Sequence, residues 1–476
     1  MLTRRSLLRS ALGLAAGAAA GLRLGGSGQA GKQASLRLSP GALAPSVPEN
    51  FIGLGYEMSS AAQLGLLSAQ NTEYVQLVRN LSSHGVFRFG GIVADFSSYA
   101  LEGPVRTDPK NTVISQASLK QLRGFLDATG WTVIWSLNFG RGTLQQAIVE
   151  AKAVHSILGS RLDAIELGNE VENYRHGDHP LRKAPWGFDQ YLAEYREWHQ
   201  AIVAAIPGLR FAGPDTAASV QWVQETADQA RAEVQLLTTH FYLGDQRNAT
   251  LLQLTQPDPR LKSKLERLRQ ISRNAGIPWR MCETNSFFGG GRPGLSDTFA
   301  GALWTLDFLL LLAASGCAGV NLETGVNQLG FLSSYSPIRT DADGQVWAGA
   351  PYYGMLAFAA AGVEGAELLP VEKTGSDSEL TAYAVRRQGF VRAVVVLNWS
   401  QSNQVSVSIA GLGLRSPQVL RLTAPGFSSK EGVHFGGEGV DAQGRWSPKE
   451  DERLQSDSIA LPPASAVVLR ESNDQA

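Results

Sequence analysis

Two glutamates lie at the carboxyl ends of predicted β-strands, where catalytic side chains are often found. Glu170 closes the segment Ile165–Glu170, and Glu283 closes the segment Trp279–Glu283. Cleaving a glycoside requires one carboxyl group that is protonated and donates to the leaving oxygen, and a second that is ionised and attacks the anomeric carbon. Either glutamate alone is typical of a solvated strand end, but two that face one pocket meet both needs. The pair therefore predicts glycosidase chemistry.

The sequence repeats a pattern of a strand followed by a helix. This pattern predicts parallel strands whose carboxyl ends meet around one pocket. Runs rich in β-branched and aromatic residues recur along the first two thirds of the chain, and each is followed by a helical pattern. Eight such units over roughly 300 residues fit an α/β fold of the (β/α)8 (TIM) barrel type. We expect residues 45–365 to form this catalytic barrel. The eight predicted strands span residues 51–57, 86–90, 132–138, 164–170, 210–215, 236–242, 279–283 and 318–323.

Polar residues that close the predicted strands form the list of candidate site residues, because active sites of such barrels lie at the carboxyl ends of the strands. Besides the two glutamates, this list holds Glu57, Asn138, Asn169, Asp215, His240, Tyr242 and Glu323.

The pattern changes after about residue 365 to short segments in which apolar and polar residues alternate between turn signals. This alternation predicts an antiparallel β-sandwich domain over residues 366–476. Residues 34–38 show the same alternation ahead of the barrel, so the segment 31–44 is expected to add a strand to the sandwich. The predicted strands of this domain span residues 380–387, 390–398, 404–409, 418–423 and 458–470.

The first 30 residues have the pattern of a bacterial twin-arginine signal peptide. Arg4 and Arg5 precede an apolar stretch, Ala11–Leu22, which is shorter than the ~20 residues of a membrane span. This predicts export to the periplasm or the medium rather than a membrane anchor. The apolar segment Phe299–Ala314 is interrupted by Asp307 and is expected to be a buried helix, so no stable membrane insertion is predicted.

Composition indicates a globular protein without a basic surface for polyanions. Charged residues make up 18% of the chain and hydrophobic residues 43%. Without the four leader arginines, 38 Lys and Arg remain against 43 Asp and Glu, a balance of −5. This argues against binding nucleic acid, and also against an endo-acting activity on sulfated chains. We expect a carbohydrate substrate, a monomer, and two free thiols at Cys282 and Cys317.

Neither a metal nor a cofactor is predicted. His176, Asp178 and His179 have no helical spacing and no evident third ligand, which is typical of a solvated loop. The segment Gly289–Gly294 formally matches a dinucleotide-binding pattern, but Pro293 stands where the helix of that motif should begin.

Four segments with Asp95 occur in an order that resembles glycoside hydrolase family 79, which contains β-glucuronidases and heparanases. The resemblance extends from about residue 51 to residue 337. The segments that carry it are Phe87–Gly91, Glu166–Glu170, His240–Tyr242 and Glu283–Gly291, the last continuing to Leu295–Phe299.

The resemblance implies a retaining mechanism. In that mechanism Glu170 is the acid/base, Glu283 is the nucleophile, and Asn169 contacts the sugar 2-hydroxyl. Retaining glycosidases hold their two carboxyl groups about 5 to 5.5 Å apart.

The resemblance also implies that Glu57 and Asp95 hold sugar hydroxyls and that Tyr242 lies beside the nucleophile. A tyrosine at a strand end is as often part of the core. His240, two residues earlier, is also typical of a barrel histidine whose hydrogen bonds are satisfied locally.

One position departs from the family pattern. Where the family commonly has a tyrosine that recognises the uronic carboxylate, this chain has Phe288, which lacks the hydroxyl donor. Backbone N–H groups of Gly289 and Gly290, with Ser334 and Tyr335, are the alternative groups that we expect to bind a carboxylate.

The sequence therefore predicts a retaining, exo-acting β-glucuronidase that removes terminal glucuronic acid, with or without a 4-O-methyl group. A retaining β-glycosidase for neutral sugars is the first alternative, because Phe288 replaces the uronate-binding tyrosine. A non-catalytic carbohydrate-binding protein is the second.

Overall fold

The computed structural model describes residues 32–39, 45–101, 111–176, 180–326, 332–375, 379–449 and 452–471. The predicted signal peptide lies outside these described residues, and so do Asp178 and His179 of the rejected metal motif.

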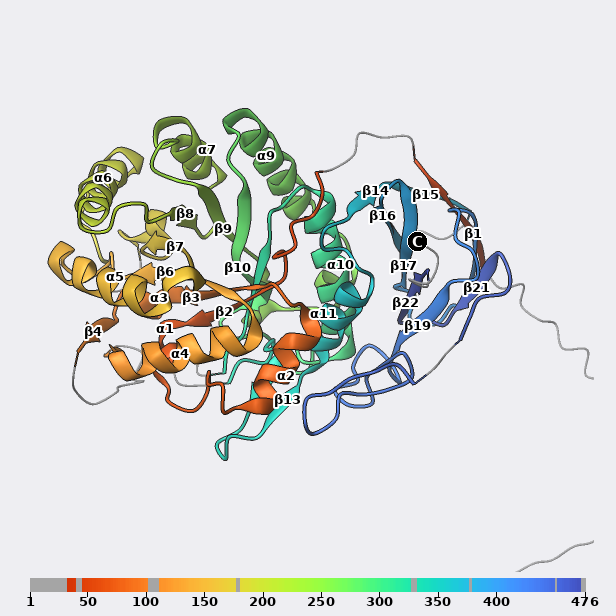
Figure 1. Cartoon of the computed structure of the whole chain (residues 1–476). Helices are drawn as coiled ribbons and strands as arrows, with labels where there is room; N and C mark the ends of the chain where they lie inside the picture. Colours follow the sequence, from red (N-terminus) through yellow and green to blue (C-terminus); the bar gives the residue numbers. More distant parts are fainter. Residues whose placement is uncertain are drawn as a thin grey trace, which may run out of the picture. The chain divides into compact units, whose positions relative to one another are not determined.

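Eight parallel strands close into a barrel, as the sequence predicts (Figure 1). Around the barrel the strands follow the order β10, β11, β2, β3, β6, β7, β8, β9. Side chains that fill its interior are buried. The strands are β2 (Gly53–Glu57), β3 (Val86–Gly90), β6 (Thr132–Leu137), β7 (Leu162–Leu167), β8 (Phe211–Thr216), β9 (Leu236–Asp245), β10 (Trp279–Phe288) and β11 (Val320–Glu323).

Helices that follow the strands surround the barrel, and local signals define their ends. For example, Ser115 accepts a hydrogen bond from the Ser118 backbone at the start of α4, and Gly130 ends that helix with a φ of 83°. The helices of the barrel are α1 (Met58–Ala62), α2 (Thr72–Leu81), α3 (Gly91–Ala94), α4 (Gln116–Thr129), α5 (Leu144–Leu158), α6 (Phe188–Ala205), α7 (Val220–Gln229), α8 (Leu251–Thr255), α9 (Pro259–Ala275), α10 (Phe299–Ala314) and α11 (Ala350–Ala360). Two short pairs, β4 (Ser98–Ala100) with β5 (Val113–Ser115) and β12 (Ile338–Thr340) with β13 (Val346–Ala348), lie in the connections.

Two sheets form the predicted β-sandwich. A six-stranded sheet has the order β14, β16, β17, β22, β19, β20, and a four-stranded sheet has the order β15, β1, β18, β21. The strand expected near residues 34–38 is present as β1, which pairs with β18 in parallel and with β15 antiparallel. The strands are β1 (Lys32–Leu38), β14 (Glu367–Leu369), β15 (Val371–Gly375), β16 (Leu380–Arg387), β17 (Phe390–Asn398), β18 (Val405–Gly411), β19 (Gln418–Thr423), β20 (His434–Phe435), β21 (Ser458–Leu461) and β22 (Ser465–Arg470).

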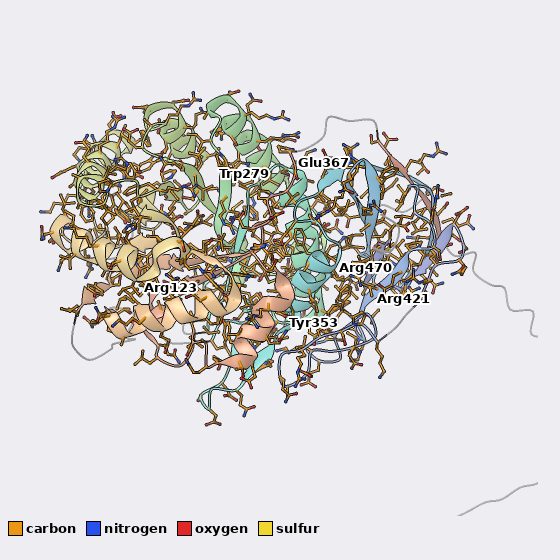
Figure 2. The ribbon with its side chains drawn as sticks, viewed as in Figure 1. Arg123, Trp279, Tyr353, Glu367, Arg421 and Arg470 are labelled. Atoms are coloured by element: carbon orange, nitrogen blue, oxygen red, sulfur yellow. The ribbon has the colours of Figure 1, made fainter. Side chains whose placement is uncertain are left out.

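The six-stranded sheet is buried on both faces, which explains the unbroken apolar run in β17. Val394 and Val396 pack into the core between the two sheets, whereas Val395 and Leu397 belong to the core shared with the barrel. Helices α10 and α11 lie between the barrel and this sheet (Figure 1). Tyr353 of α11 lies at the boundary (Figure 2), where its hydroxyl accepts a hydrogen bond from the Val440 backbone N–H at 3.0 Å.

Several predicted strand boundaries were wrong. Strand β9 continues to Asp245 and β10 to Phe288, so Tyr242 and Glu283 lie inside their strands rather than at the predicted ends. Two other boundaries differ because the chain changes direction. The segment 458–470 is two strands in different sheets, because the chain turns at Pro462 and Pro463, which cannot donate ladder hydrogen bonds. Strand β7 ends at Leu167 rather than at Glu170, because Gly168 and Glu170 adopt positive φ values of 81° and 50°.

The remaining predictions about single elements hold. Cys282 and Cys317 are both buried free thiols. Residues Phe299–Ala314 form the buried helix α10. Among the described helices, none combines the length and the apolar character needed to cross a membrane.

Candidate active site

Glu170 stands on a turn just beyond the carboxyl end of β7. Its left-handed backbone is uncommon for a residue with a side chain and is found mostly where the surroundings fix it. The Glu170 backbone N–H donates to the Asp215 carbonyl at 2.8 Å, which ties the turn to β8. A Cβ on Gly168 would lie 2.1 Å from the Tyr174 hydroxyl, so the turn needs glycine there. This arrangement leaves the Glu170 side chain 28% exposed at the barrel mouth.

Glu283 lies within β10, and both of its carboxylate oxygens accept hydrogen bonds. Tyr242 of β9 donates its hydroxyl to Oε1 at 2.9 Å, and Arg88 of β3 donates Nη1 to Oε2 at 2.7 Å. The side chain is 12% exposed. The two donors, one of them a guanidinium, fix the orientation of the Glu283 carboxylate.

The two glutamates face each other across the site. One carboxylate oxygen of Glu170, one of Glu283 and a ring nitrogen of His240 all lie within 4.8 Å of one another. Because Glu283 contacts an arginine and Glu170 is the more exposed of the two, the carboxyl groups occupy different electrostatic surroundings. The two groups can therefore take different roles in one reaction.

Arg88 is the central cation of the site. Its side chain is fully buried and donates to Glu166 at 3.1 Å, to Asn169 at 2.9 Å and to Asp215 at 2.5 Å, in addition to Glu283. Burial by itself lowers the pKa of Arg88, but the surrounding carboxylates outweigh it and hold that pKa well above its usual value. Arg88 thus stabilises several negative charges inside the barrel at once.

His240 links the acid/base candidate to the barrel interior. Its Nδ1 lies 3.3 Å from Glu170 Oε1, and its Nε2 lies 2.8 Å from Asp215 Oδ1. Burial lowers the pKa of His240, but the charges of Asp215 and Glu283 outweigh that effect and raise the pKa well above its ordinary value. A charged imidazole donates from both nitrogens, so His240 holds Glu170 and Asp215 together.

Glu57 and Asp95, the predicted hydroxyl-binding residues, are buried at the same end of the barrel. Burial is the main cause that raises the pKa of Glu57 to about 8, although the Val93 backbone N–H donates to its carboxylate at 2.8 Å. Burial likewise raises the pKa of Asp95 to about 7, although Tyr174 and the Gly140 backbone N–H donate to it at 2.7 and 2.9 Å. In slightly acidic solution both groups are largely neutral acids.

Glu323, which ends β11, is a third buried acid beside the site. Neither of its carboxyl oxygens has a hydrogen-bond partner among the described residues. Burial, with Glu283 and Glu57 as neighbours, holds its pKa well above the ordinary value. A Cβ on Gly55 would lie 2.6 Å from Glu323 Oε2, so glycine leaves room for this side chain.

The residues expected to bind a uronic carboxylate lie on two adjoining loops. The Ser334 backbone N–H donates to the Gly290 carbonyl at 2.6 Å, so the segment 289–291 lies against the segment 333–335. Gly289, Gly290 and Gly291 all have positive φ values, between 78° and 95°. The Tyr242 ring lies 6.4 Å from the Tyr335 ring and 6.3 Å from the Phe288 ring. These loops therefore border the side of the site where Tyr242 holds Glu283.

No family model matches the chain. The sequence is 26% identical to a β-glucuronidase of Aspergillus niger over 416 residues, which cover 78% of this chain and 75% of the relative. It is 25% identical to a β-glucuronidase of Neurospora crassa over 447 residues, which cover 81% of this chain and 78% of the relative. The chain is therefore similar to two fungal β-glucuronidases over most of its length.

A solved structure shares the whole architecture. The crystal structure of a 4-O-α-L-rhamnosyl-β-D-glucuronidase from Fusarium oxysporum matches with a TM-score of 0.74 and 18% identity, over 91% of this chain and 99% of that chain. This likeness shows that a glycoside hydrolase shares the barrel with its appended β-sheets.

The structure brings the predicted residues to one end of the barrel and adds others that sequence reasoning missed. Arg88 lies in one of the segments that carry the family resemblance, but the sequence did not indicate its role. An arginine inside the apolar strand Val86–Gly90 is the signal of a buried cation that could have done so. Glu166 lies in a segment that carries the family resemblance and was given no role of its own, and the structure shows it as a partner of Arg88. His240 and Asp215 were strand-end candidates without an assigned function, and they contact each other directly.

Proposed function

We propose that this protein is a retaining, exo-acting β-glucuronidase of glycoside hydrolase family 79, which removes terminal β-linked glucuronic acid. The observation that carries the proposal is the approach of Glu170 and Glu283 to within 4.8 Å, oxygen to oxygen, at the carboxyl end of a closed barrel. Carboxyl groups about 5 to 5.5 Å apart are typical of retaining enzymes, and separations of about 6.5 to 9.5 Å are typical of inverting ones. Similarity to two fungal β-glucuronidases supports the substrate class.

The surroundings of the two carboxyl groups support the assignment of their roles. Glu283 has Arg88 and Tyr242 as donors, which favours an ionised nucleophile held in a fixed orientation. Glu170 is more exposed and is contacted by His240, which places it where a leaving group can depart toward solvent. We therefore assign Glu283 as nucleophile and Glu170 as acid/base.

The reaction then proceeds in two steps. Glu170 transfers its proton to the glycosidic oxygen while a Glu283 oxygen attacks the anomeric carbon, so the bond to the leaving group breaks and a glycosyl ester forms. Glu170, now ionised, takes a proton from water, and the water oxygen attacks the anomeric carbon and releases Glu283. A charged His240 stabilises ionised Glu170 between the two steps.

Neutral acids around the pair make the site compatible with an anionic sugar. Glu57 and Asp95 can donate hydrogen bonds to sugar oxygens in their protonated form, and they then carry no charge that repels a uronate. Near Phe288, the Gly289 and Gly290 backbone and the Ser334 side chain are the groups that we assign to the sugar carboxylate. Asn169, which accepts from Arg88, is assigned to the 2-hydroxyl.

One observation favours a second candidate function. Phe288 is 48% exposed beside the site and offers no hydroxyl, a surface that also suits the face of a neutral sugar. A retaining β-glycosidase for neutral sugars would use the same pair of glutamates, with a different preferred substrate.

A matched panel of nitrophenyl β-glucuronide, β-glucoside and β-xyloside tests the proposal. We expect the parent to hydrolyse the glucuronide. Its kcat should fall about 10³-fold or more in Glu170→Ala and Glu283→Gln, and it should be nearly unchanged in the control Glu172→Gln. Glu172 is a neighbouring glutamate whose carboxylate accepts from the Ala218 and Ser219 backbone. Faster turnover of a neutral glycoside than of the glucuronide would favour the second candidate function, with the same two glutamates as catalytic groups. Tight sugar binding without turnover would contradict both and favour a carbohydrate-binding protein.

We further propose that the leader directs twin-arginine export and that the exported protein is a monomer. Replacing Arg4 and Arg5 with lysine should retain the protein in the cytoplasm of a bacterial host, measured by cell fractionation. Light scattering of the purified chain should give the mass of one copy.

A further inference from the structure

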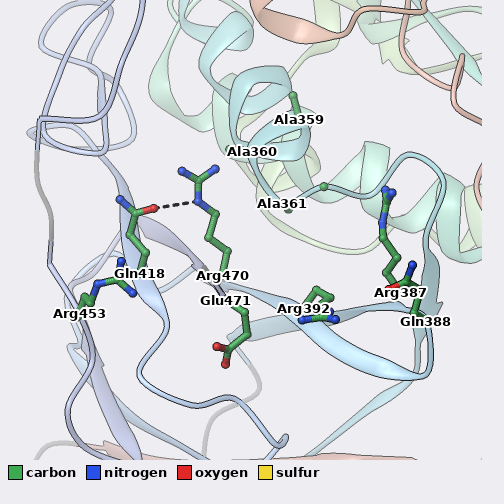
Figure 3. Close-up of a pocket in the computed structure, with 11 residues that line it drawn as sticks. Ala359, Ala360, Ala361, Arg387, Gln388, Arg392, Gln418, Arg453, Arg470 and Glu471 are labelled. Atoms are coloured by element: carbon green, nitrogen blue, oxygen red, sulfur yellow. Dashed lines mark hydrogen bonds between the residues drawn. The ribbon is translucent and has the colours of Figure 1, made fainter. Parts of the chain in front are cut away.

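A second cavity lies away from the candidate active site, between the end of α11 and one end of the six-stranded sheet (Figure 3). Its volume is about 800 Å³, enough for several sugar units. None of its lining residues belongs to the catalytic pocket. It is lined by Ala359, Ala360, Ala361, Gly362, Arg387, Gln388, Arg392, Gln418, Arg453, Arg470 and Glu471.

Among the described residues, four arginines and one acidic residue, Glu471, line this cavity. The arginines come from β16, β17, the segment before β21, and β22, so their clustering is invisible in the sequence. The Glu471 carboxylate accepts a hydrogen bond from the Arg415 backbone N–H and extends away from the Arg470 guanidinium in Figure 3. The described part of the cavity wall therefore offers guanidinium groups, among them those of Arg392 and Arg470, to an anionic ligand.

Arg470 is a half-buried cation without a carboxylate partner among the described residues. Its Nε donates to Gln418 Oε1 at 2.9 Å, and burial lowers its pKa. A cation near the carboxyl end of a helix such as α11 is stabilised by the helix dipole. Arg392 lies on the adjacent strand, and no ion pair to a carboxylate is found for it among the described residues.

An exposed aromatic ring adjoins the arginines. Phe390 is 67% exposed and follows Gln388 and Gly389 in the β16–β17 turn. The Arg392 guanidinium lies 5.7 Å from the centre of the Phe390 ring. An exposed aromatic face beside guanidinium groups combines a surface for the apolar face of a sugar with bidentate donors for a carboxylate.

We propose that this cavity is a second carbohydrate-binding site, which holds a uronate-bearing oligosaccharide by its carboxylates on Arg392 and Arg470 and by a sugar face on Phe390. The site contributes affinity for acidic glycans and takes no part in bond cleavage. It goes beyond the proposed function, because binding here requires no turnover.

Calorimetric titration of the full chain with an α-linked tetragalacturonate tests the proposal, since a β-specific catalytic site does not cleave this probe. We expect binding that weakens at least tenfold in the double variant Arg392→Gln/Arg470→Gln and about threefold or more in Phe390→Ala. Arg445→Gln is the matched control, because Arg445 is an exposed arginine elsewhere in the same half of the chain. This variant should bind the tetragalacturonate as tightly as the parent does. A carboxyl-reduced, neutral tetrasaccharide should not bind.

Two results would overturn the proposal. Unchanged affinity in the double variant and in Phe390→Ala would show that the probe binds elsewhere. Inorganic phosphate that binds as tightly as the tetrasaccharide would show a simple anion site rather than a carbohydrate site. If the double variant fails to fold, the single variant Arg392→Gln replaces it, and an affinity equal to that of the parent would then overturn the role given to Arg392.

Discussion

Replacing Arg88 with methionine tests whether one buried cation balances the acidic interior of the barrel. The change keeps an unbranched stem but removes the guanidinium that contacts Glu166, Asp215 and Glu283. Removing one partner of a buried ion pair costs about 3 to 5 kcal/mol, because a charge is left without compensation. Since three carboxylates share Arg88, we expect a loss of about 5 kcal/mol in the free energy of unfolding at pH 7. At pH 5 the loss should be smaller, because carboxylates without a cation take up protons.

Arg280→Met is the matched control for this experiment. Arg280 is equally buried in the barrel, but it donates to neutral acceptors, which include Asn321 Oδ1 at 2.6 Å and the Phe51 carbonyl at 3.3 Å. Its loss should cost about 2 to 3 kcal/mol at both pH values, since no carboxylate is left unpaired. Urea unfolding of both variants and the parent at pH 5 and pH 7 measures these differences. The same pH dependence in both variants would refute the role given to Arg88.

Three further variants test other parts of the site. Tyr242→Phe removes one donor to Glu283, and we expect kcat/KM to fall about ten- to hundredfold with an unchanged melting temperature; an unchanged kcat/KM would contradict the contact's role. For Glu57, whose pKa rises from 4.5 to about 8 on folding, the folded state holds the proton more tightly, so the parent loses stability as pH rises between these values. Glu57→Gln should lose less over that range in urea unfolding, and an equal slope would argue against the raised pKa. Phe288→Tyr should raise the ratio of glucuronide to glucoside turnover severalfold. A lower ratio would show that the sugar carboxylate does not bind beside position 288.

The fold was predictable because its signals are local and repeated. Each barrel strand is a short β-branched or aromatic run followed by a helical pattern, and all eight occur where the sequence predicts them. Boundaries failed where one residue changed the chain direction. The left-handed backbone of Glu170 follows from tertiary contacts around the turn, and no propensity of glutamate indicates it. The break at Pro462 and Pro463 was readable in the sequence, but which sheet each half joins depends on packing.

The site was predictable where polar residues follow short strand-like runs, although Glu283 and Tyr242 lie inside strands longer than predicted. Glu170 and Glu283 were identified from strand ends and from the resemblance, and the structure brings them within reach of one sugar. The role of Arg88 could not be predicted because its partners lie 78 to 195 residues away in the sequence. Only closure of the barrel brings them together. The raised pKa of Glu57 likewise depends on burial, which sequence alone does not specify.

The most direct test of the central claim is the configuration of the first product released from an aryl β-glucuronide. Proton NMR during the first seconds to minutes of turnover distinguishes the two anomers of free glucuronic acid before they equilibrate. Because Glu283 and Glu170 are close enough for double displacement, we predict that the β-anomer appears first and the α-anomer only later. An α-anomer that appears first would mean direct attack by water and would contradict the assignment of Glu283 as nucleophile.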